Sequence, residues 1–206
     1  MRAHKASATA RVIAGACVMH HEQFPRDPRV SPEMSAMCWC FLQSCAADRA
    51  LAASAGYVSM QRLWRWIERM TLPGIVSHYL NRKARIESRL RDLLASNAIA
   101  EVYVLGAGLD TLAARLAPAF PHVSFIEIDH PATQSVKREG LARVGDLAKN
   151  LTLQPCDLQT TLPASLSKKP GASRVVIAEG LLMYFKAARV QEILNAALGE
   201  GNTRVL

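Results

Sequence analysis

The spacing of apolar residues changes near the middle of the chain, from a helical period to short continuous runs. In the first half, apolar residues between Met60 and Met70 recur every three or four positions, which predicts a helix. Pro73-Gly74 interrupts this pattern, and it resumes from Ile75 to Ala95. The segment from Glu33 to Ser54 is rich in Ala, Met, Leu and Cys and also favours a helix. We therefore predict an N-terminal helical extension over residues 33–98.

In the second half, short apolar runs alternate with amphipathic stretches. The runs are rich in β-branched residues and predict four strands, at Val102–Leu105, Val123–Ile128, Leu151–Gln154 and Val175–Ala178. The stretches between them predict helices at about Asp110–Ala117, Pro131–Val144 and Ala187–Leu198, with a weak turn near Leu162–Leu166. Strands that alternate with helices favour an α/β fold with a doubly wound, mostly parallel sheet.

The two ends of the chain depart from this pattern. Residues 1–32 contain Pro25, Pro28 and Pro32, which break a long helix, so we expect a mobile lead-in there. The closing residues 203–206 have the pattern of a fifth strand that has just begun. Because a doubly wound sheet usually continues, we expect the last strands to be missing. An uncovered sheet edge would then leave the 206-residue chain marginally stable, with little or no enzymatic activity.

Basic side chains outnumber acidic ones and give a net charge of +8. Much of the excess comes from eight residues, Arg62, Arg65, Arg69, Arg82, Lys83, Arg85, Arg89 and Arg91. We expect most of them to form the solvated faces of two helices. RNA or an acidic substrate is the alternative partner. No run of aromatic residues is interleaved with these charges, as a surface for base stacking would need, so RNA is the less favoured partner.

Two further features limit the class of protein. No apolar run reaches the roughly 18 to 20 residues that cross a bilayer, so we expect no membrane span and a cytoplasmic location. The five cysteines form an odd set without the spacing of a disulfide framework. Cys38-x-Cys40 with Cys45 suggests a metal site, but no second Cys/His pair lies at zinc-finger spacing. We expect buried or half-buried free thiols and no metal.

The strongest chemical signal is a glycine turn that directly follows the first strand. Gly106-Ala107-Gly108 comes after that strand, and Asp129 ends the next one, 23 positions after Gly106. This arrangement is typical of a βαβ unit that binds a nucleoside, in which the carboxylate accepts hydrogen bonds from the ribose. Thr111 stands where a dinucleotide site has its third glycine, which helps a diphosphate approach the helix. S-adenosylmethionine (SAM) has no phosphate and fits this turn better than NAD, although an NAD-dependent oxidoreductase remains an alternative.

Five segments together resemble the leucine carboxyl methyltransferase family of class I SAM-dependent methyltransferases. The resemblance extends over residues 72–206. Its segments are Asn81–Glu87, Val104–Thr111, Phe125–Gln134 with Lys137-Arg138, Cys156–Leu158 and Ala178–Phe185. The resemblance implies a Rossmann-like SAM-binding domain at residues 99–206, preceded by the helical extension, and SAM as the cofactor.

The same resemblance implies roles for residues at the methionine end of SAM. Arg82 would pair with the methionine carboxylate, whereas its residue type alone suggests one more surface arginine. Gly106 and Gly108 would let the backbone approach the methionyl part. Glu179 would lie close to the methionine amino group. An acidic residue directly after a buried strand also favours a functional role, with helix capping as the alternative.

Other positions would contact the nucleoside or the methyl acceptor. Asp129 would bind the ribose hydroxyls. Asp157 would accept a hydrogen bond from the adenine amine and Leu158 would form an apolar wall, although Asp157 could instead cap a helix. Tyr184 is either part of the acceptor pocket or a packed core aromatic.

The resemblance implies methyl transfer to an oxygen of a carboxylate or hydroxyl, on a small molecule or a protein. A carboxylate acceptor needs no general base, which agrees with the lack of a Ser/His/Asp constellation. The rate would come from aligning the acceptor oxygen with the methyl group in a site shielded from water. A non-catalytic SAM-binding or interaction protein is the alternative, because the last strands are expected to be missing.

Overall fold

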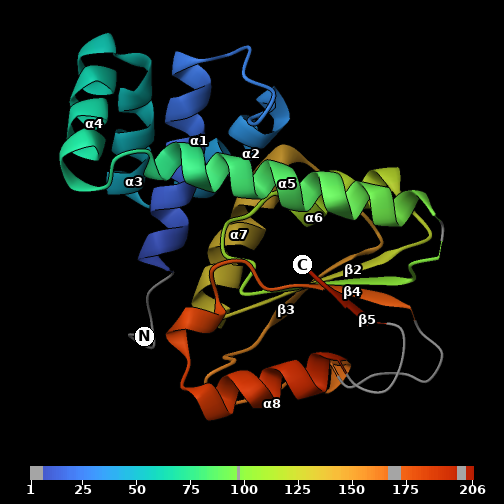
Figure 1. Ribbon diagram of the computed structural model, residues 1–206. Helices are drawn as coiled ribbons and strands as arrows, with labels where there is room; N and C mark the ends of the chain where they lie inside the picture. The colour runs from blue at the N-terminus through green and yellow to red at the C-terminus, as the bar shows by residue number, and fades with distance from the viewer. Residues whose placement is uncertain (1–6, 97, 167–172, 199–202) are drawn as a thin grey trace.

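The computed structural model describes residues 7–96, 98–166, 173–198 and 203–206. Its centre is one parallel sheet of five strands in the order β3-β2-β1-β4-β5 (Figure 1). The strands are β1 (Glu101–Leu105), β2 (Ser124–Asp129), β3 (Leu151–Pro155), β4 (Arg174–Ile177) and β5 (Thr203–Val205). The sheet confirms the expected doubly wound α/β fold, and β5 confirms the strand expected at residues 203–206.

Both faces of the sheet are covered, which explains why its strands are continuous apolar runs. Successive residues of β1 point to opposite faces, so Val102 and Val104 join one core and Tyr103 and Leu105 join the other. The first core contains residues of α5 (Ile75–Ala95), α6 (Leu112–Leu116) and α7 (Pro131–Val144). The second contains residues of α8 (Ala187–Leu198), which lies on the opposite side of the sheet in Figure 1.

The N-terminal part forms a helical layer on the first face, whereas the sequence predicts helices there only over residues 33–98. It consists of α1 (Ala8–Gln23), α2 (Pro32–Leu42), α3 (Ala46–Ala53), a short 3-10 turn η1 (Ser54–Gly56) and α4 (Val58–Thr71), followed by α5. Helix α2 packs against both α1 and α7. Its approach to α7 is close, because a Cβ on Gly140 of α7 would lie 2.9 Å from Cα of Phe41 in α2. The helical extension is therefore joined to the sheet domain by direct packing.

The expectation of a mobile lead-in over residues 1–32 is wrong for most of this segment. Residues 8–23 form α1, and Ala14, Cys17 and Val18 are buried in the core. Ser7 begins the helix by accepting a hydrogen bond from Ala10 N at 3.2 Å. The prolines at 25 and 28 lie after the end of the helix, so they bound it and do not interrupt it.

The other boundaries follow the sequence pattern closely. Helices α5, α7 and α8 begin and end where the pattern predicts, and each of the four expected strands lies within one residue of its predicted bounds. The single helix expected over residues 33–54 is broken between Leu42 and Ala46. Helix α6 is shorter than expected: it begins two residues later, at Leu112, and the 3-10 turn η2 (Ala117–Ala119), which contains Pro118, follows it directly.

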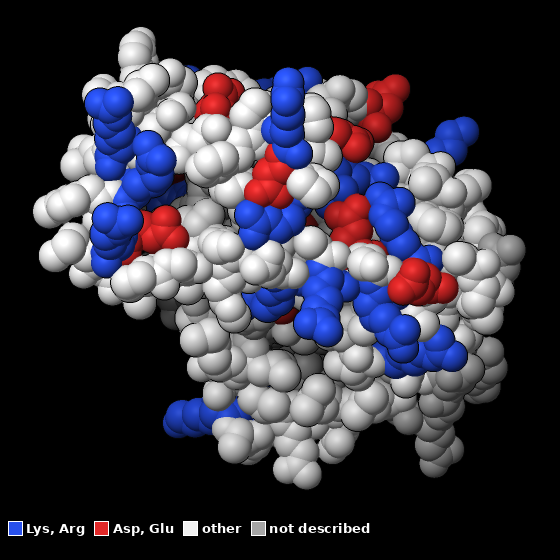
Figure 2. Space-filling model, turned by 45° about the horizontal axis from the view of Figure 1, so that its top comes forward, with Lys and Arg blue, Asp and Glu red and all other residues white. Residues whose placement is uncertain are grey.

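Charged side chains are spread over the surface. Figure 2 shows basic and acidic side chains interspersed on one face. Six of the eight basic residues singled out in the sequence are exposed, as solvated helix faces require; they are Arg62, Arg65, Arg69, Arg85, Arg89 and Arg91. Arg82 and Lys83 are the exceptions, because both are half-buried. No helix in the described parts of the chain is long and apolar enough to cross a membrane.

Candidate functional site

A cavity of about 500 Å³ lies at the carboxyl ends of β1, β2 and β4, where the order of strands reverses. This reversal is where open α/β sheets bind ligands. All eight residues singled out in the sequence line it, namely Arg82, Gly106, Gly108, Asp129, Asp157, Leu158, Glu179 and Tyr184. They come from five separate parts of the chain, so the fold gathers them into one place.

The glycine turn forms the floor of this cavity. Gly106 and Gly108 have φ values of 62° and 53°, in the left-handed region that glycine adopts without strain. Gly106 N donates a hydrogen bond of 2.8 Å to Ile128 O, which ties the turn to the end of β2. A Cβ on Gly106 would lie 2.6 Å from Cδ1 of Leu181, on the loop after β4. Both glycines are therefore required by the backbone geometry, and they leave main-chain atoms open to the cavity.

Asp129 is held beside this turn by two backbone N–H groups. Its Oδ2 accepts a hydrogen bond of 2.6 Å from Gly108, and its Oδ1 accepts one of 2.6 Å from His130. Burial raises the pKa of Asp129, and the two N–H donors act in the opposite direction. Since a carboxylate offers about four lone-pair positions, each oxygen keeps one for a further donor. Asp129 can thus accept two more hydrogen bonds from a ligand.

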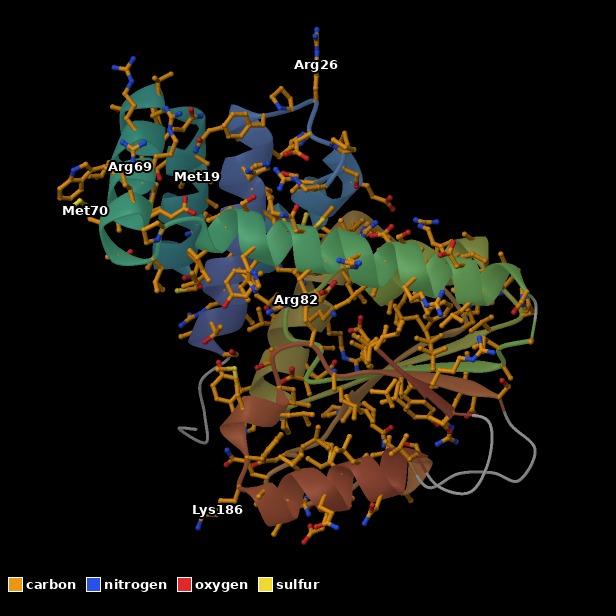
Figure 3. All side chains as sticks on the ribbon, in the orientation of Figure 1. Met19, Arg26, Arg69, Met70, Arg82 and Lys186 are labelled. Atoms are coloured by element: carbon orange, nitrogen blue, oxygen red, sulfur yellow. The ribbon has the colours of Figure 1, made fainter. Side chains whose placement is uncertain are left out.

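Four charged side chains form a connected group on another wall. Arg82 donates to Glu179 through Nε at 2.9 Å, and its Nη2 lies 2.8 Å from the same oxygen, Oε1. Lys83 Nζ lies 3.3 Å from Oε2 of Glu179 and forms an ion pair with Asp110. Figure 3 shows Arg82 beneath α5, on the side of that helix that faces the sheet. Two cations and two anions therefore lie side by side at the cavity.

Two members of this group, Lys83 and Asp110, keep each other ionised. Burial alone would lower the pKa of Lys83, but the carboxylates of Asp110 and Glu179 outweigh it and hold this pKa above its ordinary value. Burial would raise the pKa of Asp110, but Lys83 outweighs it and holds this pKa well below its ordinary range. The group therefore offers both a carboxylate and a cation to a ligand at neutral pH.

The remaining predicted residues lie at the other end and at the rim. Asp157 Oδ1 accepts a hydrogen bond of 2.9 Å from Gln159 N, so its carboxylate does cap a turn, while the residue also lines the cavity. Leu158 is buried and contributes an apolar surface. Tyr184 lies in the 3-10 turn η4 (Leu182–Tyr184) and is 53% exposed. The alternative that Tyr184 is a packed core aromatic is therefore wrong.

The structure adds residues that the sequence did not single out as part of the site. Residues of α1, among them Ala10, Ile13 and Cys17, line the cavity. The β carbon of Ala10 would lie 3.2 Å from a Cβ on Gly108, so α1 passes close to the glycine turn. Lys83 and Asp110 also line it. Both belong to segments that carry the family resemblance, which is the signal that could have identified them.

The cysteines are all free thiols, as expected. Cys17 and Cys38 are buried, and both line the cavity. Among the described residues, no group of three or more His, Cys, Asp or Glu side chains could hold a metal ion. The metal site suggested by Cys38-x-Cys40 and Cys45 is not formed by these side chains.

Comparison with known proteins finds one matching family model. A family model described as leucine carboxyl methyltransferase matches residues 40–198. No curated protein matches the chain.

The chain is also similar to solved structures. The S-adenosylmethionine-dependent methyltransferase SibL in its apo form is 18% identical with a TM-score of 0.40, over 76% of this chain and 37% of that one. PKMT2 from Rickettsia typhi in complex with AdoHcy is 16% identical with a TM-score of 0.40, over 51% and 20%. An O-methyltransferase family protein from Burkholderia thailandensis is 16% identical with a TM-score of 0.39, over 93% and 48%. The chain thus spans less than half the length of each.

Proposed function

The chain belongs to the leucine carboxyl methyltransferase family, and on that premise we propose that it binds SAM in the cavity and transfers the methyl group to an oxygen. The acceptor is a carboxylate or a hydroxyl. The cavity volume of about 500 Å³ falls within the roughly 300 to 1,000 Å³ typical of small-molecule sites.

The proposal rests on two kinds of polar group that lie at separate places in one cavity. Arg82 and Glu179 lie together on one wall, 2.9 Å apart. They can receive the carboxylate and the ammonium of an amino acid, respectively. Asp129, with a free lone pair on each oxygen, suits the two hydroxyls of a ribose. SAM joins an amino acid to a nucleoside, so its two ends match these two places.

An NAD-dependent oxidoreductase is less well supported. Thr111 occupies the position of the third glycine, and it is only 1% exposed. Its Oγ1 accepts a hydrogen bond of 3.0 Å from Arg115 Nε, so the side chain is fixed in the packing between strand and helix. These features favour a cofactor without phosphate.

The residues of the chain would act mainly by binding and orientation. Bound SAM supplies a methyl group activated by the sulfonium. Arg82, Glu179 and Asp129 would fix the two ends of the cofactor, and Asp157 and Leu158 would border the adenine. Helix α1 would shield one side of the cavity from water, which favours in-line transfer to a positioned oxygen. No proton has to be removed when the acceptor is a carboxylate.

Tyr184 and Met183 are exposed at the rim of the cavity, where an acceptor would enter. We propose that the methyl acceptor is a small molecule or a protein with a carboxylate or hydroxyl, and that the chain acts in the cytoplasm. On the face that Figure 2 shows, acidic side chains lie among the basic ones, which favours a small or protein acceptor over RNA.

Titration calorimetry with S-adenosylhomocysteine and with NAD tests the cofactor. We expect saturable binding of S-adenosylhomocysteine and none of NAD at the same concentrations. Tighter binding of NAD would overturn the proposal. Transfer of a labelled methyl group from SAM to a panel of carboxylate and hydroxyl acceptors then separates an enzyme from a protein that only binds the cofactor.

A further inference from the structure

Lys83 occupies a central place in the charged group without an evident share in binding the cofactor's ends. Its side chain is 13% exposed, whereas that of Arg82 is 33% exposed. Its Nζ contacts carboxylates from two different loops, Asp110 after β1 and Glu179 after β4. Lys83 itself comes from α5. One half-buried lysine therefore connects three elements that surround the cavity.

Each of these carboxylates uses its other oxygen for a second task. Asp110 Oδ1 accepts a hydrogen bond of 2.7 Å from the N–H of Leu112, the first residue of α6. Glu179 Oε1 is bound by Arg82. Lys83 thus holds one oxygen of each acid, and the remaining oxygens fix the start of α6 and the orientation of Arg82.

The arrangement has a consequence when the cofactor binds as proposed above. Arg82 would then turn its guanidinium toward the methionine carboxylate and release Glu179. Lys83 would remain as the cation beside both Glu179 and Asp110. Without it, two half-buried carboxylates would face one another across the loops, and one of them would take up a proton near neutral pH. A protonated Glu179 is a poor partner for an ammonium.

We propose that Lys83 is a positioning residue. It fixes the loop after β1, through Asp110, against the loop after β4, and it keeps the carboxylate of Glu179 available for the cofactor's ammonium. This inference rests on the proposed SAM site. The groups that face Lys83 are Asp110, Glu179 and Cys17, with Arg82 beside it on α5 and Cys38 next to Cys17.

The test compares Lys83→Met and Lys83→Arg with a control, Arg85→Met, an exposed residue on the same helix. Calorimetry would measure the affinity for S-adenosylhomocysteine between pH 5.5 and 8. We expect the unmodified chain and Arg85→Met to show little change with pH. Lys83→Met should bind at least tenfold more weakly at pH 6 and recover part of the loss at pH 8, because one shared proton is then released. Lys83→Arg should restore affinity to within a few-fold.

Two results would overturn the proposal: unchanged affinity in Lys83→Met, or an equal loss at every pH that Lys83→Arg does not rescue. If Lys83→Met does not fold, judged by circular dichroism, Lys83→Gln takes its place.

The failure of the SAM proposal would be recognised separately, because the unmodified chain would then not bind S-adenosylhomocysteine. In that case NMR titration of the Asp110 carboxyl carbon decides the positioning role. A rise of its pKa in Lys83→Met but not in Arg85→Met supports the role, and no rise refutes it.

Discussion

The carboxylate of Asp129 accepts a 2.6 Å hydrogen bond from the backbone N–H of Gly108. The two residues are 21 positions apart, at the ends of neighbouring strands. The bond fixes the acid against the glycine turn, so the group proposed to bind the ribose and the turn proposed to border the methionyl part move as one unit.

Replacing Asp129 by alanine should weaken the binding of S-adenosylhomocysteine by about 2 to 4 kcal/mol, as expected for the loss of hydrogen bonds to a charged acceptor. Asp129→Asn should lose less, because it retains one acceptor oxygen. Calorimetry measures both. The control is Asp92→Ala, an exposed acid on α5, which should bind normally. Wild-type affinity in a folded Asp129→Ala protein would refute the ribose assignment.

Two helical glycines should respond in opposite directions to the same substitution. A Cβ on Gly15 of α1 would meet nothing within 4 Å, so Gly15→Ala should stabilise the protein by about 0.5 to 1 kcal/mol. A Cβ on Gly140 of α7 would lie 2.9 Å from Cα and 3.0 Å from N of Phe41, and backbone atoms cannot easily move away. Gly140→Ala should therefore destabilise by about 1 to 3 kcal/mol. Urea denaturation compares the two; equal effects would mean that α2 does not pack closely on α7.

The ion pair between Glu127 of β2 and Lys137 of α7 should show strong non-additivity. Both side chains are at most 1% exposed. Lys137→Met alone should cost about 3 to 5 kcal/mol of unfolding free energy, because it leaves Glu127 buried and unpaired. The double variant Glu127→Leu/Lys137→Met should recover most of this loss. A double variant as unstable as the sum of the single variants would indicate that the pair does not interact.

The loop between α1 and α2 should become less stabilising in acid. The guanidinium of Arg29, with help from the Arg29 backbone N–H and His20, holds the pKa of Asp27 well below its ordinary range, although burial acts in the opposite direction. A depressed pKa gives stability that is present above the unfolded pKa of about 3.9 and is lost as the pH falls through the folded value. The difference in unfolding free energy between the wild type and Asp27→Asn should thus be largest above pH 5 and shrink below pH 4.

Urea denaturation at a series of pH values checks this dependence. Asp146→Asn changes an exposed acid and serves as the control, with a small difference at every pH. A constant difference for Asp27→Asn down to pH 2 would contradict the role of its charge.

Much of the fold was determined by local sequence pattern. The apolar runs of the strands and the amphipathic period of α5, α7 and α8 each record which side of an element is buried, and this information is carried within about ten residues. Pro131 and the His130 side chain, which accepts from Ala132 N at 3.2 Å, mark the start of α7 in the same local way. The glycine turn and Asp129 could be recognised because they have fixed places at the ends of two strands.

The tertiary structure alone decided which distant side chains meet. Arg82 and Glu179 are 97 positions apart and Lys83 and Asp110 are 27 apart, so no local pattern shows that they share one cavity. The position of α1 is similar: its sequence permits a helix, but only its packing on α2 places it against the glycine turn. Local periodicity specifies the burial of each element, whereas the contacts between elements depend on the path of the whole chain and on the close packing of its core.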